Sequence, residues 1–269
     1  MRFTLSLLIL AAGAACAPAP PAPASSGFPA GRLIDLSHAY DDTTIFWPTA
    51  EERFQLRSVA AGMTPAGYYY AANTFTTAEH GGTHLDAPLH FAEGRWAADE
   101  IPLDRLVGAA VVIDVSKQAG ANADYQITTA DLEAWETANG RIPAGAILLL
   151  RTDFSTRWPD AAAYLGTAER GAAAVPKLHF PGLHPGAARW LVAERDVKAV
   201  GIDTASIDYG QSTLFESHRA LYERNVPAFE NLTRLDEVPA TGASIVALPM
   251  KIAGGSGAPL RAMAIVPER

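Results

Sequence analysis

Runs of apolar residues recur along most of the chain, and their lengths and periods predict a series of strands and helices. Continuous runs rich in Val, Ile and Leu indicate buried strands, and looser alternation indicates half-buried ones. Strands are expected at residues 33–36, 54–60, 68–77, 108–115, 146–151, 197–202 and 245–252. Apolar residues at helical spacing predict helices at 129–139, 185–195 and 212–224.

The helix expected at 129–139 has recognisable signals at both ends. Thr128 or Thr129 can cap its N-terminus, Asp131 lies in its first turn, and Gly140 follows as a stop. Strands and helices interleave without a strict βαβ rhythm, and we find no internal repeat and no mid-chain linker. We therefore expect one mixed α/β domain.

The first 32 residues differ in composition from the rest. A basic start, a short apolar run and small residues predict an export signal over residues 1–15, and the run is too short for a membrane span, which needs ~20 residues. Residues 13–16 (Gly-Ala-Ala-Cys) resemble a bacterial lipobox, so Cys16, the only cysteine, is expected to be lipidated; ordinary cleavage is the alternative. Residues 16–32 read as a Pro/Ala-rich tether before a domain at 33–269. The protein is thus expected to be exported and periplasmic, as a membrane-anchored lipoprotein if Cys16 is acylated.

Composition excludes one class of partner. The 49% hydrophobic and 19% charged residues are ordinary globular values. The formal net charge is −8, and no cluster of Lys and Arg is present to displace counterions from a nucleic acid. We therefore expect no nucleic-acid partner.

A dense group of possible metal ligands lies near residue 85. His80, His84 and His90 fall within eleven residues, with Asp86 among them. Imidazole nitrogens and carboxylate oxygens are ordinary ligands of zinc and related divalent ions. The sequence Gly-Gly-Thr at 81–83 favours a freely bending loop over a helix, and in an extended stretch His84 and Asp86 point the same way. The run therefore predicts a metal centre.

This run resembles the His-x-Gly-Thr-His-x-Asp-x-Pro-x-His signature of the metal-dependent cyclase-like hydrolases, which include bacterial kynurenine formamidases and isatin hydrolases. Supporting segments lie at 46–48 (Phe-Trp-Pro), 180–183 (Phe-Pro-Gly-Leu) and 201–208. The resemblance extends from residue 33 to the C-terminus. It implies a single mixed α/β domain of the swivelling β/β/α type with a β-barrel-like core.

The resemblance also implies a division of roles within the site. Besides His80, His84 and Asp86, the family has a downstream His and Glu, twelve positions apart, that complete the metal site. In this sequence they are His218, expected on a helix, and Glu230, expected in a loop or turn. His90 would be the acid/base residue. The implied metal is one or two zinc ions, with manganese as the alternative. The full implied ligand set is His80, His84, Asp86, His218 and Glu230.

For other residues the sequence gives less support for a role in the site. Trp47 matches the place of a pocket aromatic in the family, and a buried core tryptophan fits equally well. Asp203 and Asp208 follow an expected strand and could orient a ligand histidine or make structural hydrogen bonds. His184 is expected to cap a helix. Residues 254–257 (Gly-Gly-Ser-Gly) read as a flexible loop without the lysine of a phosphate-binding loop.

These features predict an exported hydrolase for C–N bonds other than peptide bonds. A divalent ion lowers the pKa of its water to ~7, and a histidine can carry the proton to the leaving nitrogen. A kynurenine formamidase-like activity (an arylformamidase of tryptophan catabolism) is the favoured hypothesis, with isatin-type lactam or lactone hydrolysis as the enzymatic alternative. A metal-binding lipoprotein without turnover is the alternative from another class. The resemblance further implies a small-molecule substrate and a homodimer or higher homo-oligomer.

Overall fold

The structure of the protein is a computed structural model that describes residues 30–268. The expected export signal, Cys16 and nearly all of the tether lie outside the described residues. Between residues 30 and 268, no helix is long and apolar enough to cross a membrane.

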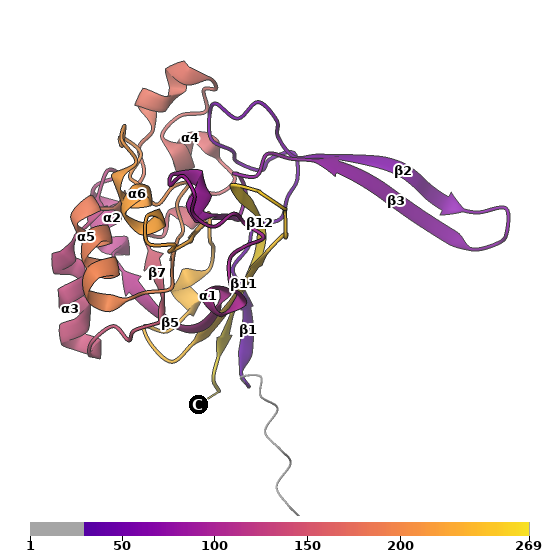
Figure 1. Cartoon of the computed structure of the whole chain (residues 1–269). Helices are drawn as coiled ribbons and strands as arrows, with labels where there is room; N and C mark the ends of the chain where they lie inside the picture. The colour runs from indigo at the N-terminus through magenta and orange to yellow at the C-terminus, as the bar shows by residue number, and fades with distance from the viewer. Residues whose placement is uncertain (1–29, 269) are drawn as a thin grey trace, which may run out of the picture.

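Seven strands close into a barrel at the centre of the fold (Figure 1). Each strand hydrogen-bonds to the next, and the seventh pairs back to the first. The order is β12 (Gly257–Val266), β11 (Ser244–Pro249), β5 (Val107–Asp114), β7 (Ile147–Arg151), β9 (Ala199–Ile202), β10 (Ala228–Glu230) and β4 (His84–Asp86). β1 (Arg32–Asp35) pairs antiparallel with the C-terminal part of β12. The expected α/β fold with a barrel-like core is confirmed.

Four neighbouring strands, β5, β7, β9 and β10, run parallel, and their side chains alternate between two apolar cores. Ile147 and Leu149 of β7 point into the barrel, whereas Leu148 and Leu150 face the layer of helices outside it. Because both faces of these strands are covered, their sequences are continuous apolar runs.

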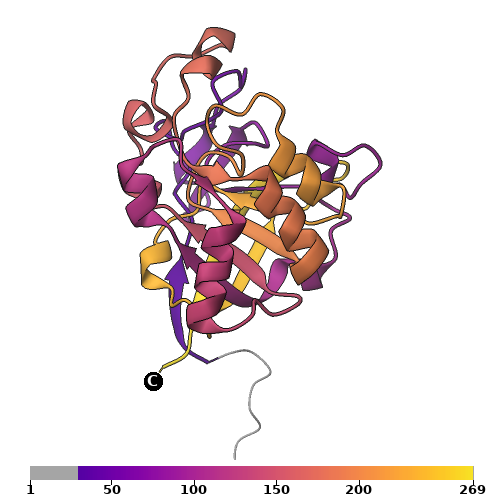
Figure 2. The same cartoon turned by 90° about the vertical axis from the view of Figure 1, so that its left-hand side faces the viewer.

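Three helices cover the outer face of the parallel strands: α3 (Thr129–Asn139), α5 (Pro185–Trp190) and α6 (Glu216–Tyr222). Figure 2 shows them in front of the sheet. The bounds of α3 are those predicted from its end signals. The Thr128 N–H donates to the Asp131 carboxylate over 2.7 Å, and Gly140 ends the helix with a φ of +89°. α5 continues as a π-helical turn, Leu191–Arg195.

Smaller elements complete the domain. The remaining helices are α1 (Leu103–Leu106), α2 (Ser116–Ala121) and α4 (Ala161–Leu165), and β6 (Gln126–Ile127) pairs parallel with β8 (Gly182–Leu183). Single 3-10 turns span Pro88–His90, Phe154–Arg157, Ala172–Lys177 and Leu235–Glu237. A third apolar cluster, around Tyr164 and Phe180, packs beside the end of the barrel that holds the site described below.

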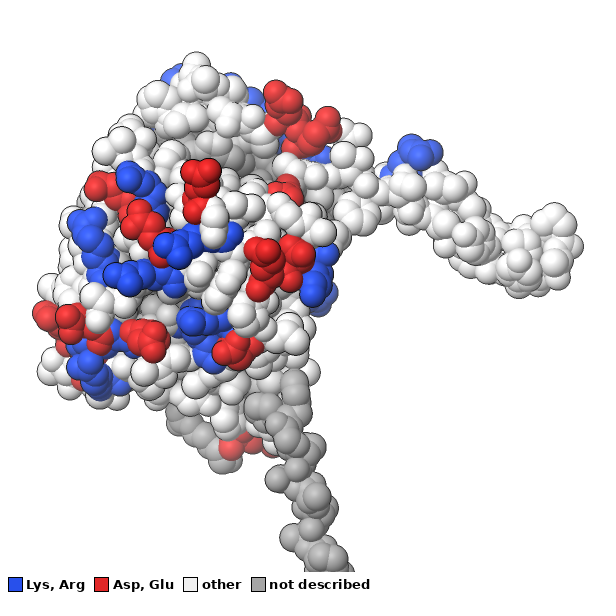
Figure 3. Space-filling model, in the orientation of Figure 1, with Lys and Arg blue, Asp and Glu red and all other residues white. Residues whose placement is uncertain are grey.

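A long hairpin of β2 (Gln55–Met63) and β3 (Tyr69–Thr76) projects away from the body (Figure 1). Figure 3 shows its surface almost free of charge, and Arg57 is the only charged residue between 55 and 76. Both strands are confirmed, but their sequences gave no sign of the projection. The exposed large apolar side chains of this region are Leu56, Val59, Met63, Tyr68, Tyr69, Tyr70 and Phe75.

Two expectations for the C-terminal region are wrong. The closing strand is not 245–252: β11 ends at Pro249, and β12 closes the barrel instead. Gly257, Pro259 and Arg261 interrupt the apolar pattern of β12, which hides it from a periodicity argument. The segment 254–257 is not a free loop either, because Gly255 and Gly257 are buried against the site described below.

Candidate metal centre

The loop between β3 and β4 carries His80 and bends sharply behind it. Gly82 has a φ of +57°, in the left-handed region that favours glycine, and a Cβ there would lie 2.6 Å from the ring of Tyr40. The Tyr40 hydroxyl lies 2.6 and 2.8 Å from the carbonyl oxygens of Gly81 and Thr83. The bend expected at the two glycines is therefore present, and packing on Tyr40 fixes it.

Strand β4 presents His84 and Asp86 on one side, as the alternation of an extended strand requires. Nε2 of His84 lies 3.1 Å from Oδ1 of Asp86, and their side chains are only 3% and 2% exposed. Leu85, between them, points into the barrel core. The strand thus fixes a histidine and a carboxylate side by side in the interior.

Two later elements bring His218 and Glu230 to the same place. β10 pairs antiparallel with β4, with Glu230 opposite His84. His218 lies on α6, as expected, with Nε2 3.1 Å from Oε1 of Glu230 and 3.4 Å from Oδ2 of Asp86. The expectation of a loop or turn at Glu230 is wrong, because residues 228–230 form a short strand between β9 and β4.

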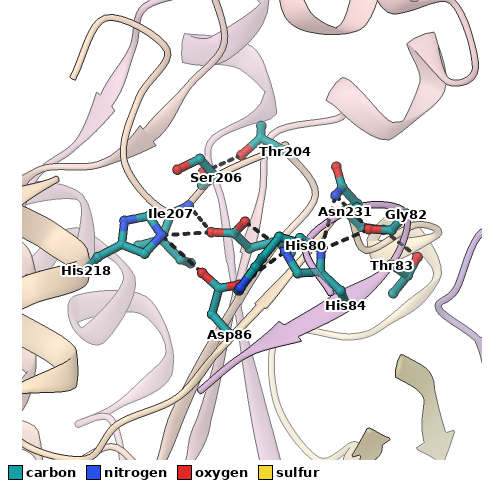
Figure 4. A network of polar contacts seen from close by, with 12 residues as sticks. His80, Gly82, Thr83, His84, Asp86, Thr204, Ser206, Ile207, His218 and Asn231 are labelled. Carbon is teal, nitrogen blue, oxygen red and sulfur yellow. Dashed lines mark hydrogen bonds and ion pairs between the residues drawn. The ribbon is translucent and has the colours of Figure 1, made fainter. Parts of the chain in front are cut away.

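The five expected ligands form two clusters that share one carboxylate, that of Asp86 (Figure 4). In each cluster the candidate ligand atoms lie within 4.8 Å of one another. A shared carboxylate suits either one ion or a pair of ions that it bridges. The clusters are His80, His84 and Asp86, and Asp86, His218 and Glu230.

Two of the histidines, His84 and His218, are held by hydrogen bonds at the ring nitrogen that points away from the clusters. Nδ1 of His84 lies 3.0 Å from the carbonyl oxygen of Gly82, and Nδ1 of His218 lies 2.5 Å from Oδ2 of Asp208. With those nitrogens as donors, Nε2 of each ring offers its lone pair toward the carboxylates. Lone pairs and carboxylates directed at one space are the donor set of a divalent cation, so these residues fit a metal ion. Asp208, left open by the sequence, holds a candidate ligand in place.

Two buried carboxylates, those of Asp86 and Glu230, repel each other in this site. Burial, and then repulsion from Asp86, raise the pKa of Glu230. Burial lowers the pKa of His218, but hydrogen bonds to neighbouring carboxylates outweigh it and raise that pKa well above its usual value. No Lys or Arg among residues 30–268 lines this cavity. A bound cation would relieve the repulsion between the buried carboxylates.

His90 lies beside the clusters and belongs to neither. It ends the 3-10 turn that begins at Pro88, and its ring stacks on His80 with centroids 3.8 Å apart. Burial lowers the pKa of His90 to about 4, so the ring is neutral at pH 7. It faces the cavity, which is where an acid/base residue must lie, and that role stays a prediction.

A cavity of about 340 Å³ opens over the clusters, and aromatic side chains line part of its wall. Phe91 stacks on Phe215 at 4.9 Å and approaches His218 at 4.8 Å. Trp47 meets Phe215 edge-on at 6.2 Å and lines the cavity, while its substrate-binding role stays a prediction. The remaining wall residues include Ile45, Phe46, Thr49, Ala205, Ser206 and Asn231.

Other residues singled out in the sequence lie away from the clusters. Nδ1 of His184 accepts a hydrogen bond from the Gly186 N–H, so His184 caps α5 as expected. The Asp203 carboxylate accepts from the N–H groups of Thr152 and Asp153 and from the Thr152 hydroxyl. Asp203 therefore makes structural hydrogen bonds and does not orient a ligand.

Several site residues were missed by sequence reasoning. The Asn231 amide donates to the Gly82 carbonyl over 2.7 Å, and the Tyr222 hydroxyl donates to Oδ2 of Asp86 over 2.9 Å. Spacing could have indicated the aromatic ones: Phe215 and Tyr222 lie three before and four after His218, which is one face of a helix. Asn231 adjoins a ligand in the chain, which is a weaker signal.

Comparisons with known proteins agree with this geometry. The model of the Cyclase family, described as "Putative cyclase", matches residues 34–209. An isatin hydrolase of Roseibium aggregatum is 35% identical over 210 residues, which cover 75% of this chain and 77% of that protein. A kynurenine formamidase of Salinibacter ruber is 30% identical over 236 residues, covering 86% and 96%.

A solved structure shares this fold. Isatin hydrolase A from Labrenzia aggregata, bound to benzyl benzoate, superposes with a TM-score of 0.80 at 34% identity, covering 88% of this chain and 94% of that chain. The present chain belongs to the cyclase family of metal-dependent hydrolases. These relatives make it a hydrolytic enzyme with a small-molecule substrate.

Proposed function

We propose that this protein hydrolyses the C–N bond of an uncharged aromatic amide, with a cyclic amide of the isatin type as the favoured substrate. The observation that carries the proposal is the cavity: four aromatic rings line part of its wall, and among residues 30–268 the only carboxylates in it are the candidate ligands Asp86 and Glu230. A flat neutral ring suits such a wall.

The same cavity argues against a zwitterionic amino-acid substrate. N-formylkynurenine carries an ammonium and a carboxylate group, and buried charges need partners. The part of the chain that the structure describes contributes no Lys or Arg to the cavity. Kynurenine formamidase activity remains the second candidate, because a relative with that name aligns over 86% of this chain.

The residues of the chain have distinct tasks in this reaction. His80, His84, Asp86, His218 and Glu230 would hold one or two divalent ions, zinc or manganese. The metal would supply a Lewis acid and a source of hydroxide near neutral pH. His90 takes a proton from the attacking water and returns it to the leaving nitrogen. The aromatic wall orients the ring and excludes bulk water from the carbonyl.

Metal analysis combined with a substrate comparison tests the proposal. Purified protein should contain about one or two equivalents of zinc or manganese, and it should open isatin faster than N-formylkynurenine or simple lactones. Chelation should abolish turnover, and the same ion should restore it. Stoichiometric metal without turnover on any of these compounds would instead support a metal-binding protein, and absence of metal would refute the proposal.

We also propose that the protein is a homo-oligomer held by the β2–β3 hairpin, with a second copy of this chain as the partner. A two-stranded hairpin alone is marginally stable in water, and this one exposes seven large apolar side chains. Light scattering should give a dimer or larger assembly, and replacing Tyr69 and Tyr70 by serine should dissociate it. A monomeric wild type would refute this.

We propose further that the protein is exported and that Cys16 is its lipid anchor. The supporting observation is the composition of residues 1–16. The mature protein should partition with membranes and carry the added mass of acyl chains, and Cys16→Ser should release it to the soluble periplasmic fraction. A mature N-terminus beyond residue 16 would exclude the anchor.

A further inference from the structure

His80 differs from the other two histidines in the nitrogen that it turns toward the cluster. His84 and His218 present Nε2, whereas His80 presents Nδ1, 2.7 Å from Oδ1 of Asp86. Its outer nitrogen, Nε2, lies 2.9 Å from Oγ of Ser256. The two nitrogens of an imidazole ring are chemically similar. The hydrogen bonds around the ring therefore decide which nitrogen can bind a metal ion.

The hydrogen bonds of Ser256 determine which nitrogen of His80 is protonated. Its hydroxyl donates to Oε2 of Glu79 over 2.7 Å, and its backbone N–H donates to the same oxygen over 3.0 Å. Because the hydroxyl proton is directed at Glu79, the Ser256 oxygen can only accept from His80. Nε2 of His80 therefore carries a proton, and with an ion in the cluster the lone pair of the ring would lie on Nδ1.

The segment 254–257 is shaped to hold this contact. A Cβ at Gly257 would lie 2.5 Å from Cε1 of His80, so only glycine lets the chain pass so close to the ring. The Ser256 carbonyl accepts from the Ala87 N–H over 2.9 Å, which ties the segment to the end of β4. A second anchor is the hydrogen bond that the Gly254 N–H donates to Asp99 over 2.9 Å.

We propose that Glu79 and Ser256 are positioning residues that set His80 to bind metal through Nδ1. The inference rests on the proposed metal site, and it assigns a function to a serine in a segment that sequence alone leaves as a loop. Histidine ligands are generally held through their second nitrogen, and loss of that partner costs 10–100-fold in metal affinity. The ring of His90 depends on the same pair, because it stacks on His80.

Metal titration of the apo-protein with Zn²⁺ tests the inference without using activity. Ser256→Ala and Glu79→Gln should each weaken binding about 10–100-fold. Ser256→Thr, which keeps the hydroxyl, should bind close to the wild type. Asp99→Ala is the matched control: it removes an anchor of the same segment without touching the His80 contact, and its affinity should change less than about threefold.

Nitrogen-15 spectra of histidine-labelled, zinc-loaded protein give the second readout. Wild-type His80 should show a coordinated Nδ1 and a protonated Nε2, and Ser256→Ala should lose that single pattern. Thermal melts of each variant establish that it is folded. Coordination through Nε2 in the wild type, or unchanged spectra and affinities in both variants, would overturn the inference alone, whereas a wild type without zinc would overturn the metal site itself.

Discussion

The ring of His90 lies nearly parallel to the ring of His80, with centroids 3.8 Å apart and an angle of 20° between the planes. His80 is itself fixed on both sides, by Asp86 and Ser256. The stack therefore holds His90 against the ligand cluster and leaves its nitrogens free of bonds to it. That arrangement would separate the proposed acid/base residue from the candidate metal ligands.

Substitution of His90 should separate turnover from metal binding. His90→Ala should keep its metal and lose about 10²–10⁴-fold in kcat, the usual contribution of a general acid/base group. His84→Ala should lose metal, because it removes a ligand. Metal content and kcat are measured on the same preparations, with His184→Ala, which alters only a helix cap, as the control. Metal loss in His90→Ala but not in His84→Ala would reverse the assigned roles.

Asp208 should affect metal affinity by orienting His218, without contacting the substrate. Its carboxylate lies 2.5 Å from Nδ1 of His218 and also accepts from the Ser212 hydroxyl over 3.1 Å. Asp208→Asn should weaken metal binding about 10–100-fold. Ser212→Ala removes its contact with Asp208 and the hydrogen bond that the Ser212 oxygen accepts from the Phe215 N–H, but it spares the bond to His218 and should leave metal affinity near the wild-type value. Equal losses in both variants would point to disruption of the local loop.

The aromatic wall should affect substrate binding more than chemistry. Phe215→Leu keeps an apolar side chain but removes the rings' stacking with Phe91 and the edge contact with Trp47. A ring pair between Phe215 and an aromatic substrate would contribute about 0.5–1.5 kcal/mol, so KM for an aromatic amide should rise about 2- to 12-fold with little change in kcat. Steady-state kinetics measures both constants, and an unchanged KM would remove Phe215 from the substrate site.

The charge state of Asp203 should make the fold less stable at high pH. Burial raises its pKa from 3.8 to about 7, so between these values the native state keeps a proton that the unfolded chain has released. Its contribution to the free energy of unfolding is complete below the lower pKa and is lost as the pH rises through about 7. Urea unfolding should show this fall in the wild type and a flatter profile in Asp203→Asn.

Removal of the metal should lower the melting temperature. An ion held at a thousand times its Kd stabilises the native state by about 4 kcal/mol, and each kcal/mol shifts Tm by roughly 2–4 °C in a domain of this size. Chelation should therefore lower Tm by about 8–16 °C, and added Zn²⁺ should restore it. An unchanged Tm would mean that the clusters hold no structurally coupled ion.

Local signals predicted the parts of the fold that depend on local physics. The helix at 129–139 was placed correctly because a capping residue and a terminal glycine mark its ends. The buried strands at 146–151 and 197–202 were found because coverage on both faces leaves a continuous apolar run. The candidate metal site was predictable in part because three of its residues lie within seven positions.

The features that the sequence did not predict depend on contacts between residues far apart in the chain. Glu230 was expected in a loop because a three-residue strand has no periodicity, and only its pairing with β4 makes it one. Ser256 and Glu79 lie 177 positions apart, and no sequence pattern predicts that they form a hydrogen bond. The resemblance to a family indicated His218 as a candidate ligand, which its helical pattern could not do.

The closing role of β12 has a consequence for how the protein matures. β4, which carries His84 and Asp86, lies between β10 and β12, and β12 follows every other strand in the chain. The pairing that closes the barrel therefore joins segments more than 170 residues apart and must wait until residues 257–259 have been made. A nascent chain can fold its parallel strands and helices earlier and can pair β4 with β10, but the barrel stays open and His80 lacks its contact with Ser256 until then. Metal acquisition should thus be a late event that marks completion of the fold.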